Sequence, residues 1–497
     1  MFLTLAFIGL NFGYAEAAPT KKISYTFDYQ MAGDVPEVLI TLKFQGDESG
    51  RTALSLPMNW GGQVDLYKAT SGYTCHTGGC RIEPSDVPTA LYIIHEPGEM
   101  VEFSYVLKQD WTGDFNNSNY YRAHLTADYL FMIGNAILVT PDNYQGFPVE
   151  LTFAWQNLPR EWAVMTSFGV GSSFKTVVSD IDVMRSATYT AGDYRVLGDE
   201  IRGVYTYVAI RGDWPFEDKA FAKLTTGIIR NIRRFWKDYN ADQFLVTLIP
   251  TDGKCCSLGG TSLSNSFALF VTEDGAKLDS FEWLLSHELL HHWISGMLRL
   301  EGPEEQGYWF SEGFTNYYSR LLRLRGGQMT LPEYVEDYNK AIADYYMSPA
   351  RNETLADVEA KFWTDQNTGK LPYLRGDILA HNWNAGIKDD RDGTNLDTAM
   401  KELLKSRRQT AEEITLVELD RVIERHLERS IMPDVENYLV AGNTIDLDPT
   451  ALSACYGVSE VEKTSSVGTN MMVPQYVLNE REWRKNRDEC EVWFLEN

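Results

Sequence analysis

Two histidines four residues apart, His287 and His291, constrain this chain more than any other feature of its sequence. On an α-helix such residues lie about 40° apart around the axis and one turn apart along it, so both imidazoles point into the same space. Apolar residues flank them at helical spacing, and Asp279 with Glu282 has the spacing of a capping box. The segment therefore predicts a helix that ends near Gly296 and presents two imidazoles to one metal ion.

A third ligand is needed, because a catalytic zinc ion takes three protein ligands and keeps one position open. Glu312 follows His291 after twenty intervening residues and opens a second amphipathic stretch, 312–324. The connection at 302–307 is rich in turn residues and lets two helices come together. We therefore predict one zinc ion per chain, held by His287, His291 and Glu312.

Two further residues are candidates for roles beside the metal. Glu288 follows the first ligand and is predicted to act as general base, taking the proton of a metal-bound water. Asn316 lies one turn after Glu312 on the same helix face, so its amide is predicted to orient His287 or Glu312. H-E-x-x-H also occurs by chance on buried structural helices, and the W-x-x-E-G pattern at 309–313 is what favours a zinc site.

Length and charge limit the classes of partner. The chain has 497 residues, 44% of them hydrophobic, which is enough for two or three domains. Forty-five basic residues against seventy acidic ones give a net charge of −25, which disfavours nucleic acid and anionic membranes as partners. We expect a soluble protein that acts on a peptide or protein substrate. The sequence leaves the oligomeric state open.

The first residues indicate export. Residues 1–18 combine an apolar core with small residues of the A-x-A kind, which is typical of a signal peptide, although no basic residue precedes Lys21. The segment is either cleaved or retained as an anchor, and no other apolar run predicts a membrane span. The protein is therefore expected in the periplasm or outside the cell.

Cysteine spacing agrees with an oxidising compartment. Cys75 and Cys80 close a short loop, and Cys455 with Cys490 would tie down the C-terminal tail, so we expect these two disulfides. The pairing of the neighbouring Cys255 and Cys256 stays open, since adjacent cysteines rarely bond each other without strain.

The hydrophobic pattern divides the chain into successive parts. Residues 19–200 alternate apolar and polar residues in short runs between turns, which predicts an all-β, sandwich-like domain. Residues 201–442 are mixed α/β and then helical, with strands at 243–250 and 267–272 and a helix expected at 377–383. Residues 443–497 form a tail with weak strand character.

Three motifs resemble the glycyl aminopeptidase family of gluzincin metallopeptidases, which are relatives of the aminopeptidase N group. They are H-E-L-L-H-H-W at 287–293, W-F-S-E-G-F-T-N-Y-Y at 309–318 and Y-L-R-G at 373–376. The resemblance implies an α+β multidomain protein, with the β domain followed by a thermolysin-like catalytic domain that includes a helical subdomain. It also implies that Tyr373 donates a hydrogen bond to the oxyanion formed during peptide-bond hydrolysis.

The chain departs from this family at one specificity element. Its segment 259–266 is similar to a family G-G-x-E-H-x-x-S segment whose glutamate holds the free α-amine of the substrate. Gly259, Gly260 and Ser262 are therefore expected to contact the substrate, but Ser262 offers no charge to an ammonium group. Either another carboxylate replaces the glutamate, or the enzyme also cuts N-blocked and internal bonds. A PDZ domain, frequent at the C-terminus of family members, is not indicated here.

The leading prediction is thus a zinc metallopeptidase of the aminopeptidase kind, with exopeptidase specificity open. One alternative is a catalytically weak pseudo-peptidase that serves as a binding or scaffolding module. Another is a hydrolase of non-peptide substrates on the same metal centre. The peptidase is favoured because all five residues that its chemistry needs are present, namely the ligands His287, His291 and Glu312, the base Glu288 and the oxyanion donor Tyr373.

Overall fold

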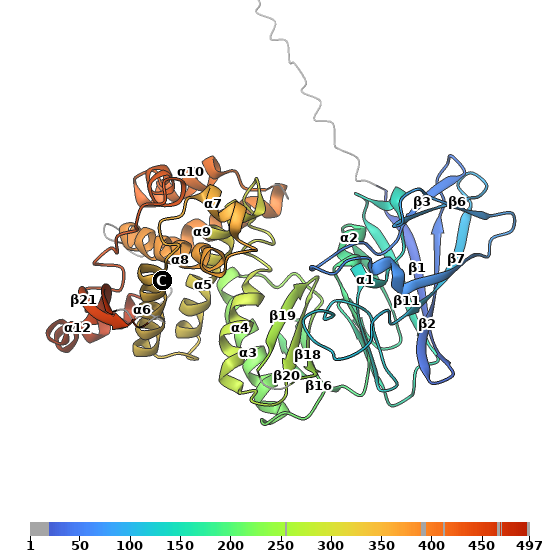
Figure 1. Ribbon diagram of the computed structural model, residues 1–497, viewed down its shortest axis with the longest axis horizontal. Helices are drawn as coiled ribbons and strands as arrows, with labels where there is room; N and C mark the ends of the chain where they lie inside the picture. Colours follow the sequence, from blue (N-terminus) through green and yellow to red (C-terminus); the bar gives the residue numbers. More distant parts are fainter. Residues whose placement is uncertain are drawn as a thin grey trace, which may run out of the picture.

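The computed structural model describes residues 19–253, 256–388, 394–410, 413–464, 468 and 470–494. The predicted signal segment 1–18 lies outside these residues. A β-rich part occupies one end of the long axis, a sheet covered by helices lies in the middle, and a helical part forms the other end (Figure 1). The predicted α+β architecture, with an N-terminal β part before a helical C-terminal part, is confirmed.

The β-rich part is built on a six-stranded sheet of order β14-β11-β1-β2-β7-β4. Burial alternates along β1 (Lys21–Ala32) and β2 (Val35–Gln45), because every second side chain enters the core. A four-stranded and a five-stranded sheet complete this part. The other strands are β3 (Arg51–Ser55), β4 (Thr70–Cys75), β5 (Arg81–Pro84), β6 (Ala90–Ile94), β7 (Met100–Lys108), β8 (His124–Leu125), β9 (Tyr129–Ile133), β10 (Thr140–Pro141), β11 (Val149–Gln156), β12 (Ala163–Thr166), β13 (Gly169–Val170), β14 (Ser173–Val178) and β15 (Thr188–Gly192).

The middle part is a five-stranded sheet of order β16-β17-β18-β20-β19. Its three inner strands are parallel and its two edge strands antiparallel. The bounds are β16 (Arg195–Ile201), β17 (Val204–Ile210), β18 (Gln243–Thr251), β19 (Leu258–Leu263) and β20 (Ser266–Thr272). Since β16 pairs with β17, residues 195–201 belong to this sheet.

Both faces of this sheet are covered. Val246 and Leu248 of β18 join the core beneath the helices, whereas Leu245 and Ile249 join a second core shared with the β-rich part. Helices α3 (Asp218–Trp236) and α4 (Leu278–Leu290) lie on the helical face. The near-continuous apolar sequence of β18 follows from this burial on two sides.

The helical part packs on α4. Its helices are α5 (Glu304–Arg325), α6 (Leu331–Met347), α7 (Leu355–Lys361), α8 (Gln366–Lys388), α9 (Leu396–Thr410), α10 (Leu416–Leu427), α11 (Met432–Asp434) and the π-helix η3 (Val435–Val440). The tail is more regular than expected, since β21 (Tyr456–Thr464) and β22 (Asn470–Leu478) form a hairpin followed by α12 (Glu480–Val492). Short helices of the β-rich part are η1 (Leu66–Ala69), α1 (Gly134–Ile137), η2 (Asp142–Tyr144) and α2 (Ile181–Arg185).

Both predicted disulfides are present. Cys75 is bonded to Cys80, and Cys455 is bonded to Cys490, which fixes α12 to the start of β21. The pairing of Cys255 and Cys256, which the sequence left open, involves a residue outside the described part of the chain, Cys255. Within the described part of the chain, no helix combines the length and apolar character that a membrane span requires.

Three local predictions around the candidate site are wrong. Helix α4 has Lys277 at its N-cap without a side-chain cap, so Asp279 and Glu282 form no capping box. The second helix begins at Glu304, just after a proline, and not at Glu312. Helix α8 runs through Pro372, which lies in its second turn, because packing against α5 offsets the hydrogen bond that proline cannot donate.

Two glycines let α5 and α8 cross at very short distance. A Cβ on Gly376 would lie 1.7 Å from the carbonyl oxygen of Trp309, and one on Gly313 would lie 2.3 Å from the Cα of Gly376. Backbone atoms stand on both sides, so neither contact can relax by a side-chain rotation. This crossing places Tyr373, one turn before Gly376, against the helix that carries Glu312.

We expect Gly376→Ala to lower the melting temperature measured by calorimetry, because overpacking a helix contact typically costs ~1 to 3 kcal/mol. Gly386→Ala is the matched control on the same helix, since its Cβ would meet only the end of the Leu427 side chain. Equal shifts for the two variants would contradict the role given to the crossing.

Candidate metal centre and active site

The three predicted ligands lie together between α4 and α5. The Nε2 atoms of His287 and His291 are 3.1 Å apart, and they lie 3.2 and 3.3 Å from Oε2 of Glu312. These residues form the one group of three or more metal-binding side chains found among the described residues. Helix α4 ends at Leu290 and His291 is its C-cap, yet His291 keeps helical dihedrals, so the two imidazoles still face one space.

This donor set fits zinc. Four tetrahedral ligands at about 2.0 to 2.1 Å from a zinc ion lie about 3.3 Å from one another. The three observed separations have this length. Two nitrogens and one carboxylate oxygen also match the ligands of catalytic zinc sites, which keep a fourth position open.

The outer nitrogen of each histidine has its own partner. Nδ1 of His287 lies 2.9 Å from Oδ1 of Asn316, and Nδ1 of His291 lies 3.2 Å from the carbonyl oxygen of Ile294. Each oxygen accepts an Nδ1–H and so leaves Nε2 as the free lone pair that faces the cluster. Asn316 therefore lies where the sequence placed it, against His287.

Charge and burial separate the two glutamates. Burial alone would raise the pKa of the Glu312 carboxyl, but the adjacent imidazoles of His287 and His291 hold that pKa well below its ordinary value. The pKa of the Glu288 carboxyl is raised, because the effect of burial exceeds the lowering effect of the same two imidazoles. Glu312 is thus suited to remain an ionised ligand, and Glu288 to accept and release a proton.

The phenol of Tyr373 stands over the cluster. Its ring is 6.0 Å from that of His287 and nearly parallel to it, and Trp283 stacks on the same imidazole at 5.1 Å. Burial and the carboxylates of Glu312 and Glu288 raise the pKa of Tyr373, so the hydroxyl keeps its proton. The sequence motif indicated Tyr373, whereas Trp283 was missed, although it precedes His287 by one helical turn.

The segment with Gly259, Gly260 and Ser262 forms the edge strand β19, beside α4. Ser262 is half-buried and pairs with Phe267 of β20. The neighbouring Thr261 is hydrogen-bonded to Tyr121, a residue of the β-rich part whose pKa is raised by burial and by Glu288. The structure thus brings this strand and a tyrosine from the other part toward the general-base candidate.

His292 points elsewhere. Its ring contacts Trp293, and burial lowers its pKa to about 4. The three histidines of the β-rich part are also hydrogen-bonded locally. His76 contacts Ser104, His95 contacts Thr52, and His124 contacts Tyr129.

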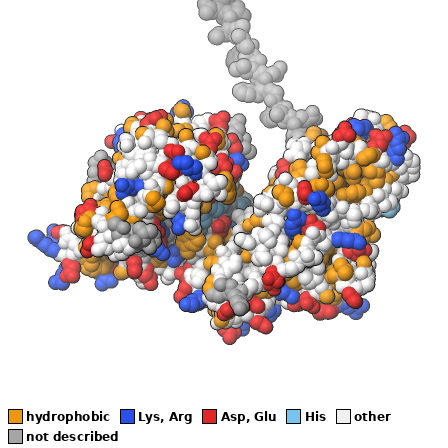
Figure 2. Space-filling view, viewed as in Figure 1, with side chains coloured by type: hydrophobic (Ala, Val, Ile, Leu, Met, Phe, Trp, Pro, Cys, Tyr) orange, Lys and Arg blue, Asp and Glu red, His pale blue; other side chains and the backbone are white. Residues whose placement is uncertain are grey.

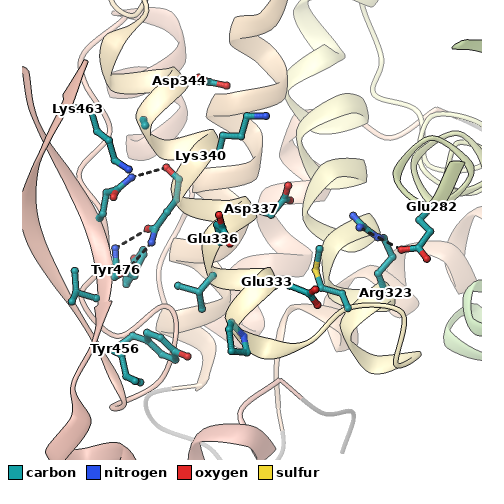
Figure 3. A pocket seen from close by; sticks show the side chains of 18 of the residues that line it. Glu282, Arg323, Glu333, Glu336, Asp337, Lys340, Asp344, Tyr456, Lys463 and Tyr476 are labelled. Atoms are coloured by element: carbon teal, nitrogen blue, oxygen red, sulfur yellow. Dashed lines mark hydrogen bonds and ion pairs between the residues drawn. The ribbon is translucent and has the colours of Figure 1, made fainter. Parts of the chain in front are cut away.

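A large groove elsewhere does not belong to this centre. It has a volume of about 1160 Å³ and runs between α6 and the C-terminal hairpin, with Glu336, Lys340 and Tyr476 on its walls (Figure 3). None of the three ligands lines it. The surface is also hollowed between the helical part and the middle sheet, where α4 and β19 lie (Figures 1 and 2).

The segment that carries this centre resembles a known family. Residues 280–373 match the model of the M61 glycyl aminopeptidases, a segment that contains the metal cluster and ends at Tyr373. The chain is similar to a glycyl aminopeptidase-like zinc metallopeptidase. This confirms the resemblance predicted from the three motifs. A search of curated protein sequences gave no match.

Solved structures show the same fold over most of the chain. An aminopeptidase N family protein from Idiomarina loihiensis aligns with a TM-score of 0.71 at 16% identity, covering 90% of this chain and 81% of its own. An M1 zinc metallopeptidase from Deinococcus radiodurans aligns with a TM-score of 0.54 at 13% identity, and the alignment covers 87% of this chain and 95% of that enzyme. A mutant of that enzyme bound to a Tyr-Ser-Ala substrate aligns with a TM-score of 0.53 at 13% identity, with the same coverage.

Asn316→Ala should lower zinc affinity about 10- to 100-fold, because the amide fixes the tautomer and orientation of His287. Competition with a chromogenic chelator measures this affinity. Gln306→Ala is a control on the same helix, where the amide contacts only the exposed Glu359. Equal affinities in the two variants would show that Asn316 merely packs.

Proposed function

We propose that this protein is a zinc-dependent peptidase in which His287, His291 and Glu312 hold the metal. The observation that carries the proposal is the cluster itself, where three ligand atoms lie at zinc-like separations and both outer imidazole nitrogens are already bonded. A bound zinc ion supplies a Lewis acid that polarises a carbonyl group and acidifies water. The family match over residues 280–373 supports the same activity.

The proton transfers fall to Glu288. Its carboxylate adjoins the ligands and is the candidate to take a proton from the attacking water and to deliver it to the leaving nitrogen. The Tyr373 hydroxyl is the candidate donor to the oxyanion on the scissile carbonyl, a charge that exists only as the bond breaks. Both groups approach the cluster from different helices, α4 and α8.

Export of the protein is part of this proposal. Two disulfides, one in each end of the described chain, favour an oxidising compartment such as the periplasm or the extracellular space. The division into domains at residues 200 and 442 stays a prediction.

Glu288→Gln tests the mechanism most directly. Glutamine keeps the size of the side chain and leaves the metal ligands intact, so zinc content and fold should persist while turnover of a peptide falls at least ~10²- to 10⁴-fold. Zinc is measured by elemental analysis and turnover by release of amino acids. Turnover near that of the wild type would assign the base to another group.

Ser262→Glu tests the specificity element. A charge-assisted hydrogen bond contributes ~1.5 to 3 kcal/mol, so the variant should prefer free over acetylated N-termini by one to two further powers of ten. Rates on paired peptides give this ratio. A wild-type preference above about a hundredfold would contradict the loss of anchoring at this position, and an unchanged ratio in Ser262→Glu would show that residue 262 does not face the amine.

A further inference from the structure

One large aromatic side chain beside the metal centre takes no part in a core. Trp283 of α4 is 44% exposed and belongs to none of the three hydrophobic cores found among the described residues. Its neighbours on the helix, Phe281, Leu284 and Leu285, are buried in the core beneath the helices. Tryptophan is well buried on average, because its large apolar surface is costly to leave in water. The exposure of this indole is therefore not explained by packing of a core.

The indole lies directly on a metal-ligand candidate. Its ring is 5.1 Å from the imidazole of His287 and 26° from parallel to it. Tyr373, the candidate oxyanion donor, has its ring 6.0 Å from the same imidazole at 22°. A zinc ion lies about 2 Å from a coordinating imidazole nitrogen. The scissile carbonyl that Tyr373 would reach and the open part of the indole therefore adjoin one and the same imidazole.

Helix α4 directs this side chain to the same side as the ligands. Trp283 precedes His287 by four residues, so the two share one helix face, one turn apart. Glu282 is turned about 100° away from Trp283. It lines the large groove near α6 together with Arg323, whereas Trp283 is not among the residues that line that groove. The open indole thus belongs to the side of α4 that carries the metal cluster.

The exposed surface of the indole is a flat apolar platform. One part of it covers the imidazole, and the rest can stack on a second ring or pack against an aliphatic side chain. The centroids of paired aromatic rings lie about 4.5 to 7 Å apart. The Cα atom that precedes a scissile carbonyl carbon is only about 1.5 Å from it. A phenylalanine or leucine side chain next to the scissile bond can therefore reach the indole while the carbonyl stays at the metal.

We propose that Trp283 is a specificity-determining residue whose indole binds an aromatic or large aliphatic side chain of the substrate residue next to the scissile bond. The proposal rests on the proposed peptidase function and deepens it, because it names the class of side chain that the centre prefers. The stack on His287 holds the indole in place for this contact. Because the contact involves no pair of charges, added salt should not screen the preference.

The test uses zinc-loaded Glu288→Gln protein, in which peptide binding is measured by calorimetry without turnover. The ligands are triglycine and three variants of it that carry one phenylalanine, at each position in turn. At one of these positions phenylalanine should bind about three- to tenfold more tightly than glycine, the range expected for an aromatic pair. Adding Trp283→Ala should remove this gain, and adding Trp283→Phe should keep part of it. The position that shows the gain identifies the substrate residue that meets the indole.

Trp363→Ala is the matched control and should keep the gain, since Trp363 is 75% exposed but its ring contacts Tyr308 and Phe362 rather than a metal ligand. A merely structural stack would weaken the binding of all four peptides by one factor in Trp283→Ala, and an unchanged ratio overturns the proposal. A larger gain from phenylalanine in Trp283→Ala also overturns it, because the indole would then exclude large side chains. Absence of zinc-dependent cleavage by the wild type overturns the proposed function instead, and the binding ratios still decide the role of Trp283.

Discussion

The close crossing of α5 and α8 is the contact on which the candidate site depends. Gly313 and Gly376 bring the two backbones together where no side chain fits. Glu312 directly precedes Gly313, and Tyr373 lies one helical turn before Gly376. A ligand candidate and an oxyanion-donor candidate are thereby fixed against each other by backbone packing. Such contacts are stiff, because packed backbones cannot yield as a long side chain can.

Burial then gives each polar group of the centre a distinct character. The two imidazoles beside Glu312 lower its pKa and keep it ionised, whereas burial raises the pKa of Glu288. Two carboxylates on adjacent helices thus differ in proton affinity through their surroundings alone. The same burial keeps the Tyr373 hydroxyl protonated and able to donate.

The β-rich part packs directly against the middle sheet, close to the candidate centre. Phe115 and Tyr120 pack in one core with Phe270 of the middle sheet, and the backbone of Phe115 exchanges hydrogen bonds with Asp252 at 2.8 and 2.9 Å. Tyr121, next in the chain, reaches Thr261 on the edge strand. The surroundings of the edge strand beside the centre are therefore shaped by both parts.

The sequence by itself predicted the candidate ligands, the neighbouring Glu288 and the alternation of the β-rich strands, because helical spacing and strand period are local properties. Asn316 also followed from spacing along one helix. Prediction from the sequence failed at the start of α5 and at Pro372 of α8. Gly307 and Pro372 locally disfavour a helix, but tertiary packing continues both helices through them. Which tyrosine meets the edge strand depended on contacts between residues distant in the chain. Only the tertiary structure decides such contacts, because no local pattern encodes them.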